Sequence, residues 1–151
     1  MEKYIYKAEV LKIEPLCIDE NWTKEKPIDE YTYNYLVTLK IDNIIVHAFT
    51  PTTYGWHTSL EGKSVDVYFY LNNFKGEVIK YDKHDKKIIQ LDQNRFMYSI
   101  IGKIMEISKD AETIYVDCGI IIETDYNSEN EEFKEGDYIL IPEGRLDVFR
   151  K

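Results

Sequence analysis

The sequence lacks the motifs by which several classes of protein are usually recognised. Its two cysteines, Cys17 and Cys118, are far apart and outside any C-x-x-C spacing. A disulfide framework needs several paired cysteines, so we expect reduced thiols in a cytoplasmic protein. The seven glycines are scattered and form no phosphate-binding loop. No run approaches the roughly 18 apolar residues of a membrane span, and no apolar segment follows Met1, so we expect neither a membrane span nor a signal peptide.

Positive charge is also scarce. The chain carries 28 acidic against 19 basic residues, a formal net charge of −9, and only three of the basic residues are arginines. Proteins that bind DNA or RNA gain most of their affinity by neutralising phosphates. This balance therefore disfavours a nucleic-acid partner, and we expect the net charge mainly to keep the protein soluble.

Histidine is rare, and none of the three histidines belongs to a familiar catalytic signature. His47 lies within an apolar strand pattern and is interpreted as a hydrogen-bonded sheet residue, whereas His57 is the better candidate for a functional role. Asp82, His84 and Asp85 form a compact trio, but a charged turn of this kind is typical of a solvated loop. We expect no metal site, no cofactor and no catalytic residue, and we place an enzyme of unrecognised type behind two binding functions.

What the sequence does contain is apolar alternation with a period of two. Between Tyr31 and Ile41 the odd positions are mostly apolar or aromatic, and Val65 to Leu71 shows the same pattern. Strict alternation predicts half-buried β-strands. Within Tyr4–Ile13 the apolar residues change from even to odd positions near Val10 and Leu11, which predicts a bend or bulge in this strand. Similar patterns predict further strands over Tyr4–Ile13, Ile44–Phe49, Glu77–Tyr81, Lys87–Leu91, Ser99–Ile107, Thr113–Gly119, Ile120–Tyr126, Asp137–Ile141 and Arg145–Phe149.

Three local details accompany these strands. Glu77–Tyr81 and Lys87–Leu91 flank a polar loop and are predicted to pair as a hairpin. Gly102 lacks a side chain within its strand, which permits a sharp bend or the close approach of another backbone. The segment that begins at Ser128 fits a capping box and predicts a short helix that ends near Gly136.

The order of elements is similar in the two parts of the chain, which meet near residues 92–95. Glu61-Gly62 before Val65 corresponds to Glu135-Gly136 before Ile139. This order of strands, with a short helical segment before the fourth, resembles the five-stranded OB-fold, most closely over residues 98–150. We therefore predict an all-β protein with one or two short helical turns, built from two tandem OB-like or SH3-like barrels at 1–94 and 95–151. The alternative is a single larger β-barrel or sandwich.

The resemblance implies where a ligand would bind. OB-folds bind ligands on the outer face of strands two and three, beside the loops that join strands one to two and four to five. In the first part these loops are 14–30 and 72–76. Exposed aromatic rings there would stack on bases or sugars, or anchor a protein. In the competing interpretation, the tryptophans fold back over the barrel ends. The candidate binding residues are Trp22, Tyr54, Trp56, His57, Tyr68, Tyr70 and Phe74.

These patterns favour a non-catalytic binding or accessory module that acts through contacts with a protein partner. A contiguous apolar and aromatic surface patch would support this function. The alternative is a binder of single-stranded nucleic acid or of oligosaccharide, for which lysines and tyrosines would have to converge on one groove despite the acidic charge.

Overall fold

The computed structural model describes residues 4–91, 95–126 and 133–151, and in these residues it is an all-β protein with two short 3-10 turns. The predicted helix at residue 128 falls on residues outside the described ones. No helix in the described ranges is long and apolar enough to span a membrane. The elements are β1 (Tyr6–Ile18), η1 (Ile28–Tyr31), β2 (Thr32–Ile41), β3 (Ile44–Phe49), η2 (Thr58–Leu60), β4 (Ser64–Asn72), β5 (Ile79–Lys80), β6 (Lys87–Gln90), β7 (Met97–Ser108), β8 (Thr113–Asp117), β9 (Ile121–Asp125) and β10 (Tyr138–Arg150).

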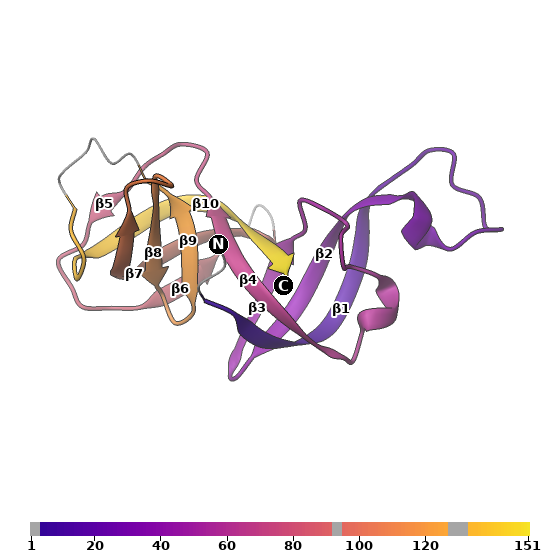
Figure 1. The fold of residues 1–151 in the computed structure, drawn as a ribbon, viewed down its shortest axis with the longest axis horizontal. Coiled ribbons are helices and arrows are strands. Elements are labelled where there is room, and N and C mark those ends of the chain that lie inside the picture. Colours follow the sequence, from indigo (N-terminus) through magenta and orange to yellow (C-terminus); the bar gives the residue numbers. More distant parts are fainter. Residues whose placement is uncertain (1–3, 92–94, 127–132) are drawn as a thin grey trace. The chain divides into compact units, whose positions relative to one another are not determined.

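The described strands form one sheet that closes on itself (Figure 1). The ring of eight strands runs β10-β3-β2-β1-β4-β9-β8-β7 and returns to β10, with β5 and β6 attached beside β10 and β7. The pairs β10–β3 and β4–β9 are parallel, which makes the barrel mixed. The prediction of two tandem small barrels is therefore wrong, whereas the alternative of one larger barrel agrees with the closed ring.

The reason for this correction is the path of the last strand. Asp147 of β10 pairs with Phe49 of β3, while Tyr138 to Arg145 pair with β7. One strand thus completes the sheet by pairing with a strand from each half of the chain. Local alternation identifies a strand but carries no information about a partner a hundred residues away.

The contacts divide the chain into two compact units, of which the first holds Met1–Tyr68 and Asp147–Lys151. Its core is built from the apolar faces of β1, β2 and β3. The predicted change of parity is confirmed, because the register of β1 on β2 shifts between Val10 and Lys12. A turn at Asp42 and Asn43 joins β2 to β3, and the two strands pair from Ile41 and Ile44 onward. The buried apolar side chains of this unit include Ala8, Val10, Ile13, Tyr35, Leu36, Val37, Leu39, Val46, Ala48 and Val67.

The second unit comprises Phe69–Leu146. Here β5 and β6 do not pair with each other, so the predicted hairpin is wrong. Instead β5 pairs with β10 and β6 pairs with β7, and β10 pairs with β7 between them. The intervening loop is held by other contacts, among them the ring of His84 stacked on Tyr138 at 4.5 Å between centroids.

The close approach predicted at Gly102 is confirmed. A Cβ atom built there would lie 2.3 Å from the carbonyl oxygen of Asp117 on the neighbouring strand β8. The backbone of β7 can cross β8 at this distance only because the side chain is absent.

Replacing Gly102 by alanine should therefore lower the free energy of unfolding by about 3 kcal/mol, because the new methyl group meets backbone that cannot rotate away. Gly62→Ala is the matched control, since Gly62 has a φ of +83° and no atom within 4 Å of a built Cβ. We expect that control to cost about 1 kcal/mol from backbone strain alone. Urea denaturation measures both, and equal losses would contradict the close-approach argument.

Candidate functional site

The first unit exposes four apolar side chains at the end of the β1–β2 hairpin. These residues, named here the hairpin patch, are Leu16, Ile18, Trp22 and Tyr33. Their exposed fractions are 39%, 40%, 37% and 58%. Leu16 and Ile18 lie in the last residues of β1, Tyr33 begins β2, and Trp22 lies in the long connection that Figure 1 shows extending beyond the two strands.

Asp19 orders the two aromatic residues of the hairpin patch. The hydroxyl of Tyr33 donates to Oδ2 of Asp19 at 2.9 Å, and the backbone N–H of Asn21 donates to Oδ1 at 2.9 Å. The backbone N–H of Trp22 donates to the carbonyl oxygen of Asp19 at 3.0 Å. The bonds from Asn21 and Tyr33 lower the pKa of Asp19 below its usual range. The carboxylate is therefore charged near neutral pH, and the connection is held in one conformation.

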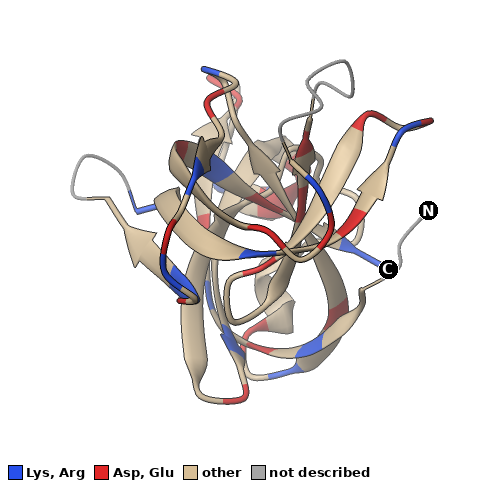
Figure 2. Ribbon diagram, turned by 90° about the vertical axis from the view of Figure 1, so that its left-hand side faces the viewer, with Lys and Arg blue, Asp and Glu red and all other residues tan. Residues whose placement is uncertain are grey.

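The segment that carries the hairpin patch is acidic. Residues 14–30 include six acidic and two basic side chains. Figure 2 shows that the lysine and arginine positions elsewhere are scattered among acidic ones and do not gather on one element. The hairpin patch is therefore a set of apolar groups in a field of negative charge.

The free edge of β1 beside the hairpin patch is protected against strand addition. The backbone N–H of Ile13 points away from β2, because it donates to Oε1 of Glu61 at 3.0 Å. Pro15 is two residues further on, so its nitrogen faces the same way, and proline has no N–H to offer an incoming strand. A partner would therefore contact the side chains of this hairpin and would not extend its sheet.

A second cluster of polar groups surrounds Asp29, whose side chain is 8% exposed. Its Oδ1 accepts from the hydroxyl of Tyr35 at 2.7 Å and from the N–H of Thr58 at 3.0 Å. Its Oδ2 accepts from the hydroxyl of Thr58 at 2.7 Å and lies 3.2 Å from Nε2 of His57. This carboxylate ties η1 to the adjoining strand β2 and to the start of η2, where Thr58 lies 29 residues further along the chain.

His57 completes the cluster as the cap of η2. The N–H of Ser59 donates to Nδ1 of His57 at 3.1 Å, which leaves the Nε2–H to donate to Asp29. The hydroxyl of Ser59 also lies 2.8 Å from Nδ1. The order serine, histidine, aspartate resembles a nucleophile relay. Here, however, the Nδ1 lone pair is taken by the backbone of Ser59 itself, and the N–H groups of Thr58 and Leu60 already have acceptors. The arrangement therefore serves to fix a turn.

Burial acts to raise the pKa of Asp29, but the hydrogen bonds from Thr58 and Tyr35 and the nearby His57 outweigh it, so this pKa lies below its ordinary value of 3.8. Burial and the bond to Asp29 raise the pKa of Tyr35 above its usual range. Both groups therefore hold their charge states, carboxylate and neutral phenol, across the neutral range.

The Asp29→Asn variant should lose about 2 kcal/mol of unfolding free energy at pH 7, because a hydrogen-bonded carboxylate is removed. A lowered folded pKa means that the carboxylate stabilises the protein above about pH 4, and that this contribution is lost as the pH falls through the folded value. The difference between the two proteins should therefore shrink between pH 7 and pH 3. Urea denaturation at both pH values measures it, and a gap that stays constant would contradict the assignment.

The aromatic residues nominated from the sequence are found in different surroundings. Trp22 belongs to the hairpin patch, and Tyr54 is 78% exposed on the loop between β3 and η2. Trp56 is 4% exposed, so it packs inside the first unit. The ring of Tyr68 stacks on Phe149 at 5.2 Å between centroids.

Tyr70 and Phe74 belong to the second unit. Tyr70 is half-buried, whereas Phe74 is 63% exposed with the guanidinium of Arg145 5.5 Å from its ring centroid. His47, interpreted as a hydrogen-bonded sheet residue, is confirmed as one, since its Nδ1 lies 2.9 Å from the hydroxyl of Thr38.

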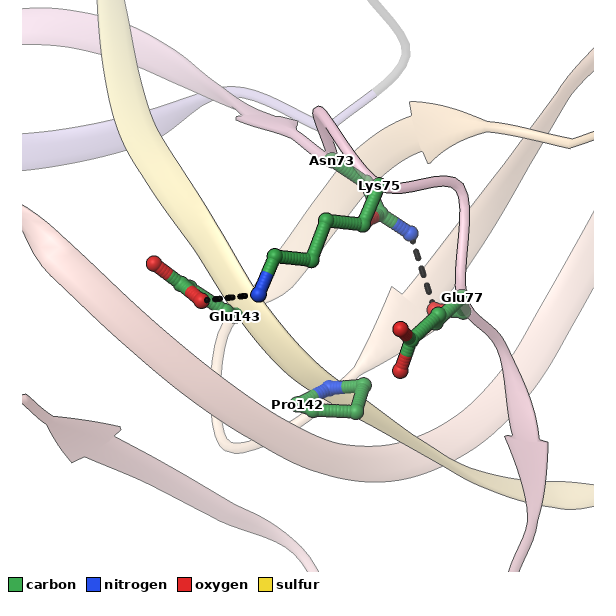
Figure 3. Close-up of a pocket in the computed structure, with 5 residues that line it drawn as sticks. All are labelled: Asn73, Lys75, Glu77, Pro142 and Glu143. Carbon is green, nitrogen blue, oxygen red and sulfur yellow. Dashed lines mark hydrogen bonds and ion pairs between the residues drawn. The ribbon is translucent and has the colours of Figure 1, made fainter.

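A small hollow beside Phe74 is lined by Asn73, Lys75, Glu77, Pro142 and Glu143 (Figure 3). Its ammonium and one carboxylate neutralise each other, because Lys75 Nζ lies 3.2 Å from Glu143 Oε2. The amide of Asn73 is used within the turn, where it donates to the carbonyl of Glu77 at 2.9 Å. The hollow is therefore a weaker candidate than the hairpin patch.

The sequence reasoning missed Leu16, Ile18 and Tyr33. Residues 14–30 were interpreted as a connection, but β1 continues to Ile18. The apolar residues Leu16 and Ile18 share one parity after Pro15, and this pattern could have predicted that the strand continues. Proline is tolerated in an edge strand. Tyr33 has the parity of buried Tyr35, yet it is exposed and its hydroxyl donates to Asp19.

Among the residues that the structure describes, no group of three or more histidine, cysteine, aspartate or glutamate side chains gathers as a metal site. No protein-family model, no curated protein and no solved structure matches this chain. A function must therefore be inferred from the surfaces described above.

Proposed function

We propose that this chain is a protein-binding accessory module, and that the hairpin patch is the surface that contacts the partner. The observation that carries this proposal is that the end of one hairpin exposes four apolar side chains, and that Asp19 bonds to the hydroxyl of Tyr33 and to the backbone of Trp22. Several exposed apolar side chains on one element are typical of protein interfaces. Tyrosine and tryptophan are also the side chains that most often dominate binding energy.

The fixed conformation of the connection supports the same function. A loop that must become ordered on binding loses affinity, whereas one that is already ordered does not. Asp19 holds both Tyr33 and Trp22 through hydrogen bonds before any partner arrives. The ring of Tyr33 and the backbone that carries Trp22 therefore meet the partner at a low cost in conformational entropy.

The acidic segment indicates the chemistry of the partner. Six carboxylates against two ammonium groups in residues 14–30 favour a surface whose apolar centre is bordered by lysine and arginine. The same carboxylates repel phosphates, which disfavours single-stranded nucleic acid as the ligand. An oligosaccharide is also disfavoured, because the polar groups of the hollow beside Phe74 are already used in bonds within the protein.

A photoreactive phenylalanine analogue placed at Tyr33 should crosslink to the partner in cells that contain this protein. The matched control position is Ile45, which is 55% exposed in the same unit but pairs with Lys40 at the opposite end of β2. We expect a protein adduct at position 33 and none at 45, and mass spectrometry identifies the partner. Equal adducts at the two positions would argue against the hairpin patch.

With that partner in hand, Trp22→Ala and Tyr33→Ala should each weaken binding at least about tenfold, whereas Ile45→Ala should not. Tyr33→Phe keeps the ring but removes the bond to Asp19, so it should weaken binding by a smaller factor through lost order. The melting temperature should stay near that of the wild type, because these side chains are exposed. Wild-type affinity in both alanine variants would overturn the proposal.

A further inference from the structure

Strand β6 is the last strand of the sheet in the second unit. It pairs with β7 on one side, and no other described strand pairs with it. The N–H of Leu91 donates to the carbonyl of Met97, so the backbone groups of Ile89 point toward β7 as well. The N–H and C=O groups of Ile88 and Gln90 therefore point away from the sheet.

β6 lacks the features that protect the edge of β1. Pro15 removes from β1 a donor that an incoming strand would need. β6 has the sequence Lys-Ile-Ile-Gln, without proline, and its register on β7 is regular from Lys87 to Gln90, so no bulge turns it away. The side chain of Ile89 is 43% exposed. An unprotected apolar edge of this kind accepts another strand by backbone hydrogen bonds.

The charges beside β6 do not oppose such an approach. Lysine on an edge strand normally repels a second copy of the same strand. Here Nζ of Lys87 lies 3.2 Å from Oδ2 of Asp85, and Nζ of Lys86 lies 2.8 Å from Oδ2 of Asp117. Each ammonium group thus has a carboxylate of its own chain. The edge is therefore close to neutral, although the chain has a net charge of −9.

The free part of this edge has a defined start. Lys86 immediately precedes β6, but its N–H donates to Oδ1 of Asp85 at 2.9 Å and cannot bond to an added strand. Within the described residues of β6, the donors and acceptors left for a second strand are accordingly those of Ile88 and Gln90. An added strand is in register when it uses all of them.

We propose that the chain forms a dimer through β6, in which two copies of this strand pair antiparallel about a twofold axis. Ile88 of one copy pairs with Gln90 of the other, so all the outward backbone groups of both residues are used. Ile89 lies opposite its own copy on the axis, as an apolar cross-strand pair. Lys87 lies opposite Leu91, so no charged side chain faces its like. The same surface serves both copies, as in most symmetric dimers.

This contact goes beyond the proposed function. It uses residues of the second unit and none of the hairpin patch, which belongs to the first. The dimer and the protein-binding function can therefore hold or fail separately.

Sedimentation equilibrium of the full chain tests the dimer. The average mass should rise from that of one chain toward that of two over about 1 µM to 1 mM, because a contact through four residues of each copy is small. Hydrogen exchange should also slow at the amides of Ile88 and Gln90 as the concentration rises. A chain that stays monomeric at the highest concentration, or exchange at these amides that ignores concentration, overturns the proposal.

Variants place the contact on β6. Ile88→Pro removes an outward N–H but no bond to β7, so it should weaken dimerisation at least about tenfold. Ile89→Lys puts like charges opposite each other on the axis and should weaken it similarly. The matched control is Ile79→Lys on β5, because Ile79 is 46% exposed in the same unit. This control should dimerise as the wild type does.

A mixture of two variants tests the twofold axis, and it still decides if Ile88→Pro fails to fold. Ile89→Lys and Ile89→Glu should each dimerise poorly alone, whereas an equimolar mixture should form a heterodimer in which opposite charges meet. Unchanged dimerisation in Ile89→Lys, an equal loss in Ile79→Lys, or no recovery in the mixture would refute this arrangement.

Discussion

The pairing of β10 with one strand from each half of the chain, β3 and β7, is the constraint on which the rest of the structure depends. Its residue Asp147 lies beside Phe49 of β3, and its first half pairs with β7. Closure in this way removes the long exposed edges that an open sheet would present to other chains. It also sets Ile139, Ile141, Leu146 and Val148 in the core with no exposed surface. Its last residues bring Arg150 onto the turn before Trp56.

Two carboxylates organise the surface of the first unit after the strands have closed. Asp29 fixes η1 against Tyr35 and the start of η2, and Asp19 holds Tyr33 and the backbone of Trp22. Both have lowered pKa values, so both stay charged at neutral pH. A long connection between β1 and β2 is thereby kept in one conformation by a few hydrogen bonds to charged groups, which are stronger than those between neutral groups. The exposed apolar residues acquire a defined geometry as a result.

The distribution of charge along the chain matters more for the hairpin patch than the net charge does. The hairpin patch lies in an acidic segment and suits a basic, apolar protein surface. A net charge of −9 does not describe this place, since the local field at a site depends on the few charges close to it.

The sequence by itself determined most of the strands, the bulge at Val10, the close approach at Gly102 and the sheet role of His47, because these follow from local alternation and from the size of single side chains. It did not show that the two strands predicted over Asp137–Ile141 and Arg145–Phe149 are one strand, β10. The tertiary structure alone decided which strands pair. It separated β5 from β6 and closed one barrel in place of two, since pairing depends on backbone groups far apart in the chain. For the same reason Asp29 met His57, Trp56 became buried beside Arg150, and Tyr33 was left exposed.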